Sequence, residues 1–170
     1  MSNEFSREPS GLERELLERF GFELEDKVIK KILTRDEIIY LTGGWFEEYA
    51  FNEINKMSTS LINDVKMGIQ VRSISGTDNE LDIAFMKDNT FYHIECKTLG
   101  EEEEQFIIRD EVYKKGAILH QLGKGGNAFI CTTHNLIRPA LLSRARDYNV
   151  VILNLNEAKN LLEEIFKRIK

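Results

Sequence analysis

The sequence predicts a mixed α/β domain preceded by a helical arm. Three observations predict this class. Apolar residues alternate with polar ones between residues 69 and 97, they recur at helical spacing on both sides of that stretch, and two short apolar segments follow the last long helix. The expected order is a helix, three strands, a helix, and then strand, helix, strand and helix. Three consecutive strands followed by strand–helix–strand units exclude a helix bundle and a β-sandwich. This order indicates a sheet with both antiparallel and parallel strands.

The arm is expected at residues 1–40, ahead of a main domain at residues 41–170. Two apolar clusters at helical spacing, separated by Gly21, predict two short helices. Their members are Leu12, Leu16, Leu17 and Phe20, then Val28, Ile29, Ile32 and Leu33. We expect this arm to serve packing or homodimer formation rather than catalysis.

The main domain begins after the break at Thr42-Gly43-Gly44. We expect a helix from Trp45 to about Met57, three antiparallel strands over residues 69–74, 81–85 and 91–97, and a long helix over residues 102–122. A buried strand at 128–132, a helix opened by proline at 139–147, a strand at 150–155 and a last amphipathic helix at 157–169 complete the order.

Composition limits the classes of function. A chain of 170 residues with 42% apolar and 31% charged side chains can bury a core, and no apolar run approaches the ~20 residues of a membrane span. The polar amino terminus does not resemble a secretion signal, so we expect a cytoplasmic protein. The net charge of −6 argues against binding to nucleic acid by bulk electrostatics alone. Cys96 and Cys131 match no metal-binding spacing.

Two neighbouring strands place charged residues where apolar ones are expected. Asp82 lies on the face opposite Leu81 and Ile83, and Glu95 shares a face with Lys97. If the turn at residues 87–89 forms a hairpin, one register brings Asp82 close to Glu95. Two carboxylates bind a hard cation such as Mg²⁺ or Mn²⁺, and a lysine beside them can orient water or stabilise charge on a phosphate. This predicts hydrolysis of phosphodiester bonds.

Two helices could contribute further groups. Glu47 falls on the apolar side of its helix and therefore needs a partner, which could be a metal, a backbone hydrogen bond or a buried arginine. In the long helix, Lys115 lies within the apolar arc, and its neighbour Lys114 lies outside it. Either lysine could reach a phosphate, or could extend its ammonium group into solvent.

These residues resemble the D…(D/E)xK signature of the PD-(D/E)XK nuclease superfamily, with Asp82 followed by Glu95-Cys96-Lys97. Three further segments, at residues 42–49, 79–85 and 94–98, together with Gly125-Gly126 before a strand, look like the nuclease domain of CRISPR ancillary nucleases. Those are effectors of type III systems that respond to cyclic oligoadenylate.

The resemblance implies a restriction-endonuclease-like αβββαβ core, dependence on Mn²⁺ or Mg²⁺, and cleavage of DNA, RNA or both in antiviral defence. It implies that Glu47, Asp82 and Glu95 are metal ligands and that Lys97 is the catalytic lysine, with Lys114 or Lys115 as an auxiliary group. The effectors also carry a separate sensor domain, and 170 residues are too few to hold both domains. We therefore do not expect activation by a second messenger within this chain, and a separate regulatory partner stays open.

Two alternatives remain open at this point. The first is a nucleic-acid-binding or regulatory module of the same fold without turnover. The second is an oligomeric scaffold built on the arm, a role that does not exclude catalysis.

Overall fold

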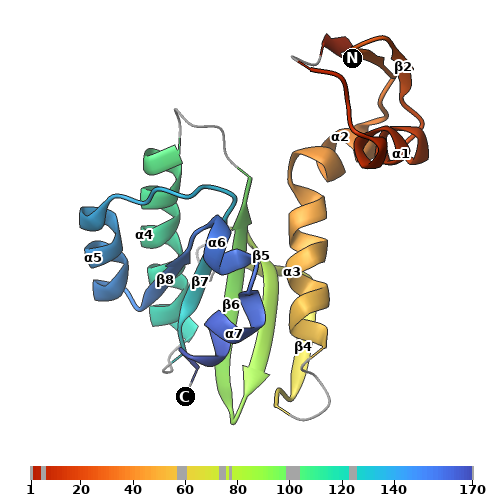
Figure 1. Cartoon of the computed structure of the whole chain (residues 1–170). Coiled ribbons are helices and arrows are strands. Elements are labelled where there is room, and N and C mark those ends of the chain that lie inside the picture. Colours follow the sequence, from red (N-terminus) through yellow and green to blue (C-terminus); the bar gives the residue numbers. More distant parts are fainter. Residues whose placement is uncertain are drawn as a thin grey trace. The chain divides into compact units, whose positions relative to one another are not determined.

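The computed structural model describes residues 2–4, 7–56, 61–72, 76, 78–98, 104–122 and 126–169. The chain forms two compact units, Met1–Leu41 and Thr42–Lys170. Figure 1 shows both units, with most of their elements labelled. No helix in the described ranges has the length and apolar character needed to cross a membrane.

The amino-terminal unit contains strands as well as helices. Its elements are β1 (Ser2–Glu4), α1 (Gly11–Arg19), β2 (Glu23–Glu25), β3 (Val28–Lys30) and α2 (Arg35–Ile39). The strands form an antiparallel sheet in the order β1-β3-β2. Both helices begin with a capping box, Ser10 with Glu13 and Thr34 with Glu37.

The expectation of a second arm helix over Val28, Ile29, Ile32 and Leu33 is therefore wrong. Val28–Lys30 is a strand that pairs with Glu23–Glu25, and the tight connection between them places Asp26 at a φ of 53°. A two-residue connection of this kind joins antiparallel strands, and β-branched Val28 and Ile29 suit a strand. Among the described residues of this unit only Pro9 is buried.

The second unit is built on a five-stranded mixed sheet in the order β4-β5-β6-β7-β8. Its strands are β4 (Asp64–Arg72), β5 (Asp78–Lys87), β6 (Thr90–Lys97), β7 (Ala128–Thr132) and β8 (Val150–Leu153). The pairs from β4 to β6 are antiparallel, and those from β6 to β8 are parallel. The predicted meander and the two later strands are thus present in one sheet.

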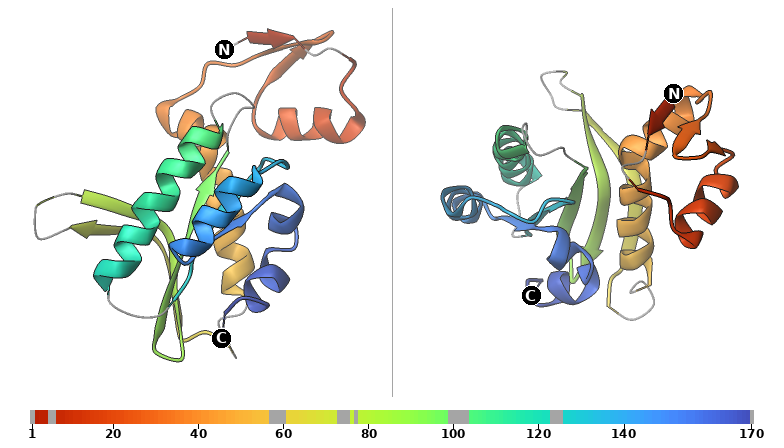
Figure 2. Two further views of the ribbon diagram at one scale, coloured as in Figure 1. Left: turned by 90° about the vertical axis from the view of Figure 1, so that its left-hand side faces the viewer. Right: turned by 45° about the horizontal axis from the view of Figure 1, so that its top comes forward.

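Helices cover both faces of this sheet (Figure 2). One face carries α3 (Trp45–Asn55), α6 (Leu155–Ala158) and α7 (Leu161–Phe166), and the other carries α4 (Glu104–Leu122) and α5 (Pro139–Asp147). A π-helical turn at Tyr40–Gly44 leads into α3, where a break was expected. The expected last helix is two short helices, because Asn160 leaves the helical conformation between them. The expected extensions of elements to Met57, Ile74 and residue 102 lie outside the described residues.

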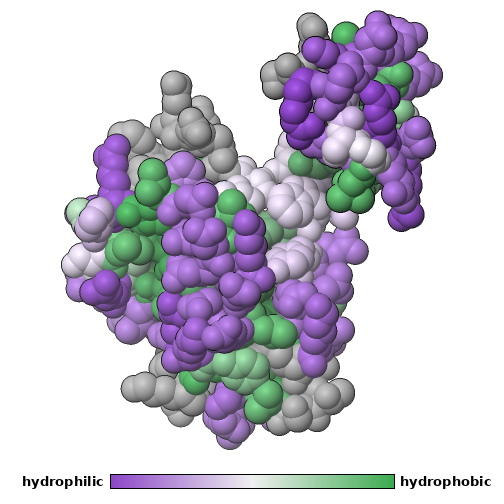
Figure 3. Space-filling view, in the orientation of Figure 1, coloured by the Kyte–Doolittle hydropathy of each residue, from purple (hydrophilic) through white to green (hydrophobic). Residues whose placement is uncertain are grey.

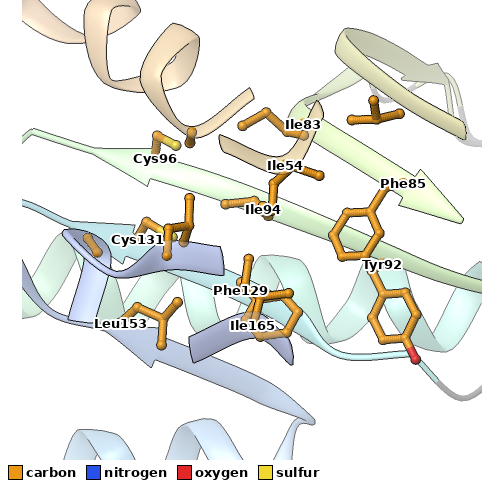
Figure 4. Packing of buried hydrophobic residues seen from close by; sticks show 14 of the residues in the cluster. Ile54, Ile83, Phe85, Tyr92, Ile94, Cys96, Phe129, Cys131, Leu153 and Ile165 are labelled. Atoms are coloured by element: carbon orange, nitrogen blue, oxygen red, sulfur yellow. The ribbon is translucent and has the colours of Figure 1, made fainter. Parts of the chain in front are cut away.

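A continuous apolar core fills the space between the sheet and α3, α6 and α7. Figure 4 shows Ile54 of α3 packed with Ile83, Ile94 and Phe129 of three adjacent strands. A second cluster under α4 and α5 is centred on Ile108 and Ile130. Hydrophilic side chains cover most of the surface over α6 and α7 (Figure 3). The strands β6, β7 and β8 are therefore buried on both faces over most of their length, and polar groups inside them require partners.

Candidate active site

Asp82 and Glu95 meet where β5 and β6 stop pairing. The ladder of paired residues ends with Ile83 opposite Ile94, and Asp82 and Glu95 come next on the two strands. Asp82 Oδ2 accepts a hydrogen bond of 2.8 Å from the backbone N–H of Cys96. The register that the sequence made available is the one observed, and it brings Asp82 close to Glu95, whose side chain contacts Lys115 of α4.

Glu95 is buried and lies between two lysines. Its side chain is only 4% exposed, and Lys97 Nζ lies 2.7 Å from its Oε1. Lys115 Nζ of α4 forms an ion pair with its Oε2. The Lys115 side chain is 0% exposed, and it also donates a hydrogen bond of 3.4 Å to the carbonyl oxygen of Glu80. Both oxygens of Glu95 therefore face ammonium groups.

The charges in this cluster shift one another's pKa. Burial opposes the ionised form of Glu95, but Lys115 and Lys97 outweigh it, and the pKa of Glu95 is lowered. Burial and then the charge of Glu95 raise the pKa of Asp82 to about 7, although the Cys96 N–H acts in the opposite direction. Burial works against the charge on Lys97, yet the carboxylates of Glu95 and Glu111 raise its pKa overall.

Glu47 approaches the same cluster from α3, which lies on the other face of the sheet. Its side chain is half-buried, and burial together with the charges of Glu80 and Glu95 raises its pKa.

The side chain of Lys114 does not contact Glu95. Its side chain is 42% exposed, and its Nζ lies 3.8 Å from Glu111 Oε1. Of the two lysines named in α4, only Lys115 reaches the carboxylate on β6.

Glu111 belongs to the cluster and was not singled out in the sequence. Its Oε1 lies 3.5 Å from Lys97 Nζ and its Oε2 lies 4.0 Å from Lys115 Nζ. The spacing of four residues between Glu111 and Lys115 is a signal that could have found it, because such residues share a helix face. Its proximity to Lys97 depends on how α4 packs on the sheet, which the spacing does not reveal.

His93 lies deeper under α4 on the same face of β6. It is 0% exposed, and neither ring nitrogen has a hydrogen-bond partner in the structure. Burial and the charge of Lys115 lower its pKa to about 4, so the imidazole is neutral at physiological pH.

The donor set suits a hard divalent cation by its chemistry. Asp82, Glu95 and Glu47 are oxygen donors whose charges oppose one another's ionisation, a repulsion that a bound cation would relieve. Within the described ranges, no three His, Cys, Asp or Glu side chains are arranged as a ready-made metal site. In the observed arrangement, Glu95 is directed to Lys97 and Lys115.

Comparison with protein families matches residues 34–170 to the family described as Card1-like, endonuclease domain. No curated protein matches the sequence significantly. Among solved structures, protein VC1899 from Vibrio cholerae superposes with a TM-score of 0.74 at 21% identity, covering 98% of this chain and 46% of that one.

Two further structures are similar. Can2 from Sulfobacillus thermosulfidooxidans, in complex with cyclic tetra-adenylate, has a TM-score of 0.77 at 20% identity, covering 96% of this chain and 46% of Can2. The small subunit of the heterodimeric restriction endonuclease R.BspD6I has a TM-score of 0.52 at 15% identity, covering 71% of this chain and 67% of that subunit. These likenesses show a restriction-endonuclease-like fold. The chain spans less than half the length of VC1899 or Can2.

Proposed function

This chain belongs to the Card1-like endonuclease domain family, and from that premise we propose that it is a metal-dependent endonuclease of the PD-(D/E)XK type. The substrate is nucleic acid, DNA or RNA, and the reaction is hydrolysis of a phosphodiester bond. One observation carries the proposal. A buried carboxylate, Glu95, sits beside Asp82 and in contact with Lys97 at the point where two strands part.

Each residue of the cluster has a role in this proposal. Asp82, Glu95 and Glu47 would hold Mn²⁺ or Mg²⁺. A divalent cation in such a site lowers the pKa of bound water and offsets charge on the phosphate. Lys97 keeps its proton next to Glu95, so its ammonium group can orient the attacking water or stabilise the developing negative charge. Lys115 forms an ion pair with Glu95 from the helix side.

A cleavage panel tests the proposal. The purified full chain is incubated with single- and double-stranded DNA and RNA in the presence of Mn²⁺, Mg²⁺ or chelator. We expect metal-dependent cleavage that falls by roughly 100-fold or more in Glu95→Gln and in Lys97→Met, the scale seen when a group that stabilises the transition state is removed. Glu47→Gln should also weaken cleavage, because it removes a ligand.

Two exposed positions serve as controls. Glu48 follows Glu47 on α3 but points to solvent, and Lys66 projects from β4 with a side chain that is 68% exposed. Glu48→Gln and Lys66→Met should cleave at the wild-type rate. Full activity of Glu95→Gln and Lys97→Met would contradict the site assignment.

The alternative function is a nucleic-acid-binding module without turnover. The observation that favours it is the complete pairing of Glu95 by two lysines, an arrangement that a non-catalytic domain could keep. Binding of nucleic acid in the cleavage panel without hydrolysis under any metal condition would support this alternative.

The proposed biological setting is CRISPR-associated defence. The family match supports it, and so does the likeness to Can2, whose structure contains cyclic tetra-adenylate. Cleavage assays with and without added cyclic tetra-adenylate will show whether the chain responds to that nucleotide. An unchanged rate would point to a separate regulatory partner.

We also propose a homodimer formed through the amino-terminal unit. Leu12 and Leu16 of α1 are 69% and 47% exposed, and the unit buries only Pro9 among its described residues, so a second copy would supply the missing apolar contacts. Light scattering should report a dimer for the wild type and a monomer for Leu12→Asp combined with Leu16→Asp. A monomeric wild type would contradict this proposal.

A further inference from the structure

The observed pairing of Glu95 conflicts with its proposed use as a metal ligand. Its Oε1 lies 2.7 Å from Lys97 Nζ, and its Oε2 contacts Lys115 Nζ. A divalent cation bound to Glu95 repels these two ammonium groups and competes with them for the same carboxylate oxygens. Metal binding therefore weakens the contact of Glu95 with at least one lysine. This step rests on the proposed function.

The lysine that Glu95 leaves behind needs another acceptor. Lys115 is 0% exposed, so water cannot solvate its charge. Its hydrogen bond to the neutral carbonyl of Glu80, at 3.4 Å, is long. A buried ammonium group without a carboxylate is strongly unfavourable, and this cost would count against metal binding.

The carboxylate of Glu111 lies close enough to both lysines to form ion pairs with their ammonium groups. Its side chain is 14% exposed, and its Oε1 lies 3.5 Å from Lys97 Nζ. Its Oε2 lies 4.0 Å from Lys115 Nζ, is shielded from solvent, and has no hydrogen-bond partner in the structure. A buried carboxylate oxygen without a hydrogen bond is uncommon, because such atoms normally find a donor.

We propose that Glu111 is a positioning residue that takes over Lys97 and Lys115 when Glu95 turns to the divalent cation. Before metal binding, the two lysines lie near two carboxylates, Glu95 and Glu111, and the closer contacts are to Glu95. Lys114 also approaches Glu111, at 3.8 Å, but its side chain is 42% exposed and water can solvate its charge. Glu111 acts through the two buried or half-buried lysines and does not itself bind the cation.

The test is a calorimetric titration of the full chain with Mn²⁺ alone, without nucleic acid. Glu111→Gln should weaken Mn²⁺ binding by roughly 10- to 100-fold, the range typical of groups that orient metal ligands. Glu111→Asp keeps the charge and should recover part of the affinity. Asp110→Asn is the matched control, because Asp110 precedes Glu111 on α4 and its side chain is 69% exposed. It should bind Mn²⁺ as the wild type does.

A double-mutant cycle separates this role from direct ligation. Lys115→Met removes the buried charge that Glu111 is proposed to receive. In that background only Lys97 is left for Glu111 to receive, so Glu111→Gln should weaken Mn²⁺ binding clearly less than it does in the wild-type background, since interacting residues show non-additive effects. If Glu111→Gln weakens binding equally in both backgrounds, Glu111 is a ligand or acts through its overall charge, and the inference is refuted.

Stability in chelator provides the remaining readout. Without metal, Glu95 still pairs both lysines, so the melting temperature of Glu111→Gln should stay within a few degrees of the wild type. A large loss of stability in chelator would show a purely structural role and overturn the inference. Wild-type Mn²⁺ affinity in Glu111→Gln would overturn it while leaving the proposed function intact. Absence of Mn²⁺ binding by the wild type would refute both.

Discussion

Asp82→Asn should stabilise the protein at pH 8 while it removes activity. Burial and the neighbouring charge of Glu95 raise the pKa of Asp82 from 3.8 to about 7. A carboxyl group whose pKa is higher in the folded state than in the unfolded state binds its proton more tightly when folded. Ionisation of Asp82 therefore costs stability, and this cost develops as the pH rises from about 4 to 7.

The magnitude follows from the shift. A difference of about 3 pKa units corresponds to roughly 4 kcal/mol at 1.36 kcal/mol per unit. Asp82 is only half-buried, so solvent screening reduces this figure, and we expect about 2 kcal/mol. For a chain of this size that corresponds to a rise in melting temperature of about 4–8 °C. The asparagine can keep the hydrogen bond from the Cys96 N–H through its carbonyl oxygen.

Thermal and urea unfolding in chelator at pH 4 and pH 8 measure this effect. The stability of Asp82→Asn should equal that of the wild type at pH 4 and exceed it at pH 8. Asp64→Asn, at an exposed position of β4, should show no such difference. Added Mn²⁺ should stabilise the wild type but not Asp82→Asn. If the variant is no more stable than the wild type at pH 8, or if the gap is the same at both pH values, the electrostatic reasoning fails.

Two further predictions concern the packing around β6. A Cβ at Gly126 would lie 1.7 Å from the carbonyl oxygen of Phe91, so Gly126→Ala should lower the free energy of unfolding in urea by on the order of 3 kcal/mol. Gly11→Ala is the control and should be nearly neutral, because a Cβ at Gly11 meets nothing within 4 Å. Equal stability of the two variants would contradict this packing. Burial lowers the pKa of His93 to about 4, so the folded state resists its protonation, and stability should fall by up to about 3 kcal/mol as the pH drops from about 6.5 to 4. His93→Leu should flatten that part of the acid titration, and an unchanged slope would show that His93 is not the titrating group.

The sequence predicted the structure best where the pattern of residues fits only one type of secondary structure. Strict alternation over Leu81, Ile83 and Phe85 predicted a strand, and the short turn after it predicted a hairpin; together they led to the approach of Asp82 to Glu95. The resemblance to CRISPR ancillary nucleases is confirmed by the family match, and the restriction-endonuclease-like core is confirmed by the fold. The roles of the individual site residues and the identity of the metal remain predictions.

The sequence was less informative where a short apolar run suits two structures. Val28 and Ile29 fit a helical spacing with Ile32 and Leu33, but over so few residues the same pattern fits a strand, and the hairpin with β2 decided the outcome. Glu111 was missed for another reason. Its relation to Lys97 arises only when α4 packs across the sheet, and no local spacing encodes that contact.

The position of β6 in the sheet limits how this family of sites can vary. Up to Ile94 the strand is bonded to β5 on one side and to β7 on the other, and its pairing with β7 continues through Glu95 and Lys97. Sliding the strand would break both ladders at once. Differences in substrate choice between related chains should therefore map to helices and connecting segments around this strand, with the carboxylate and ammonium positions held constant.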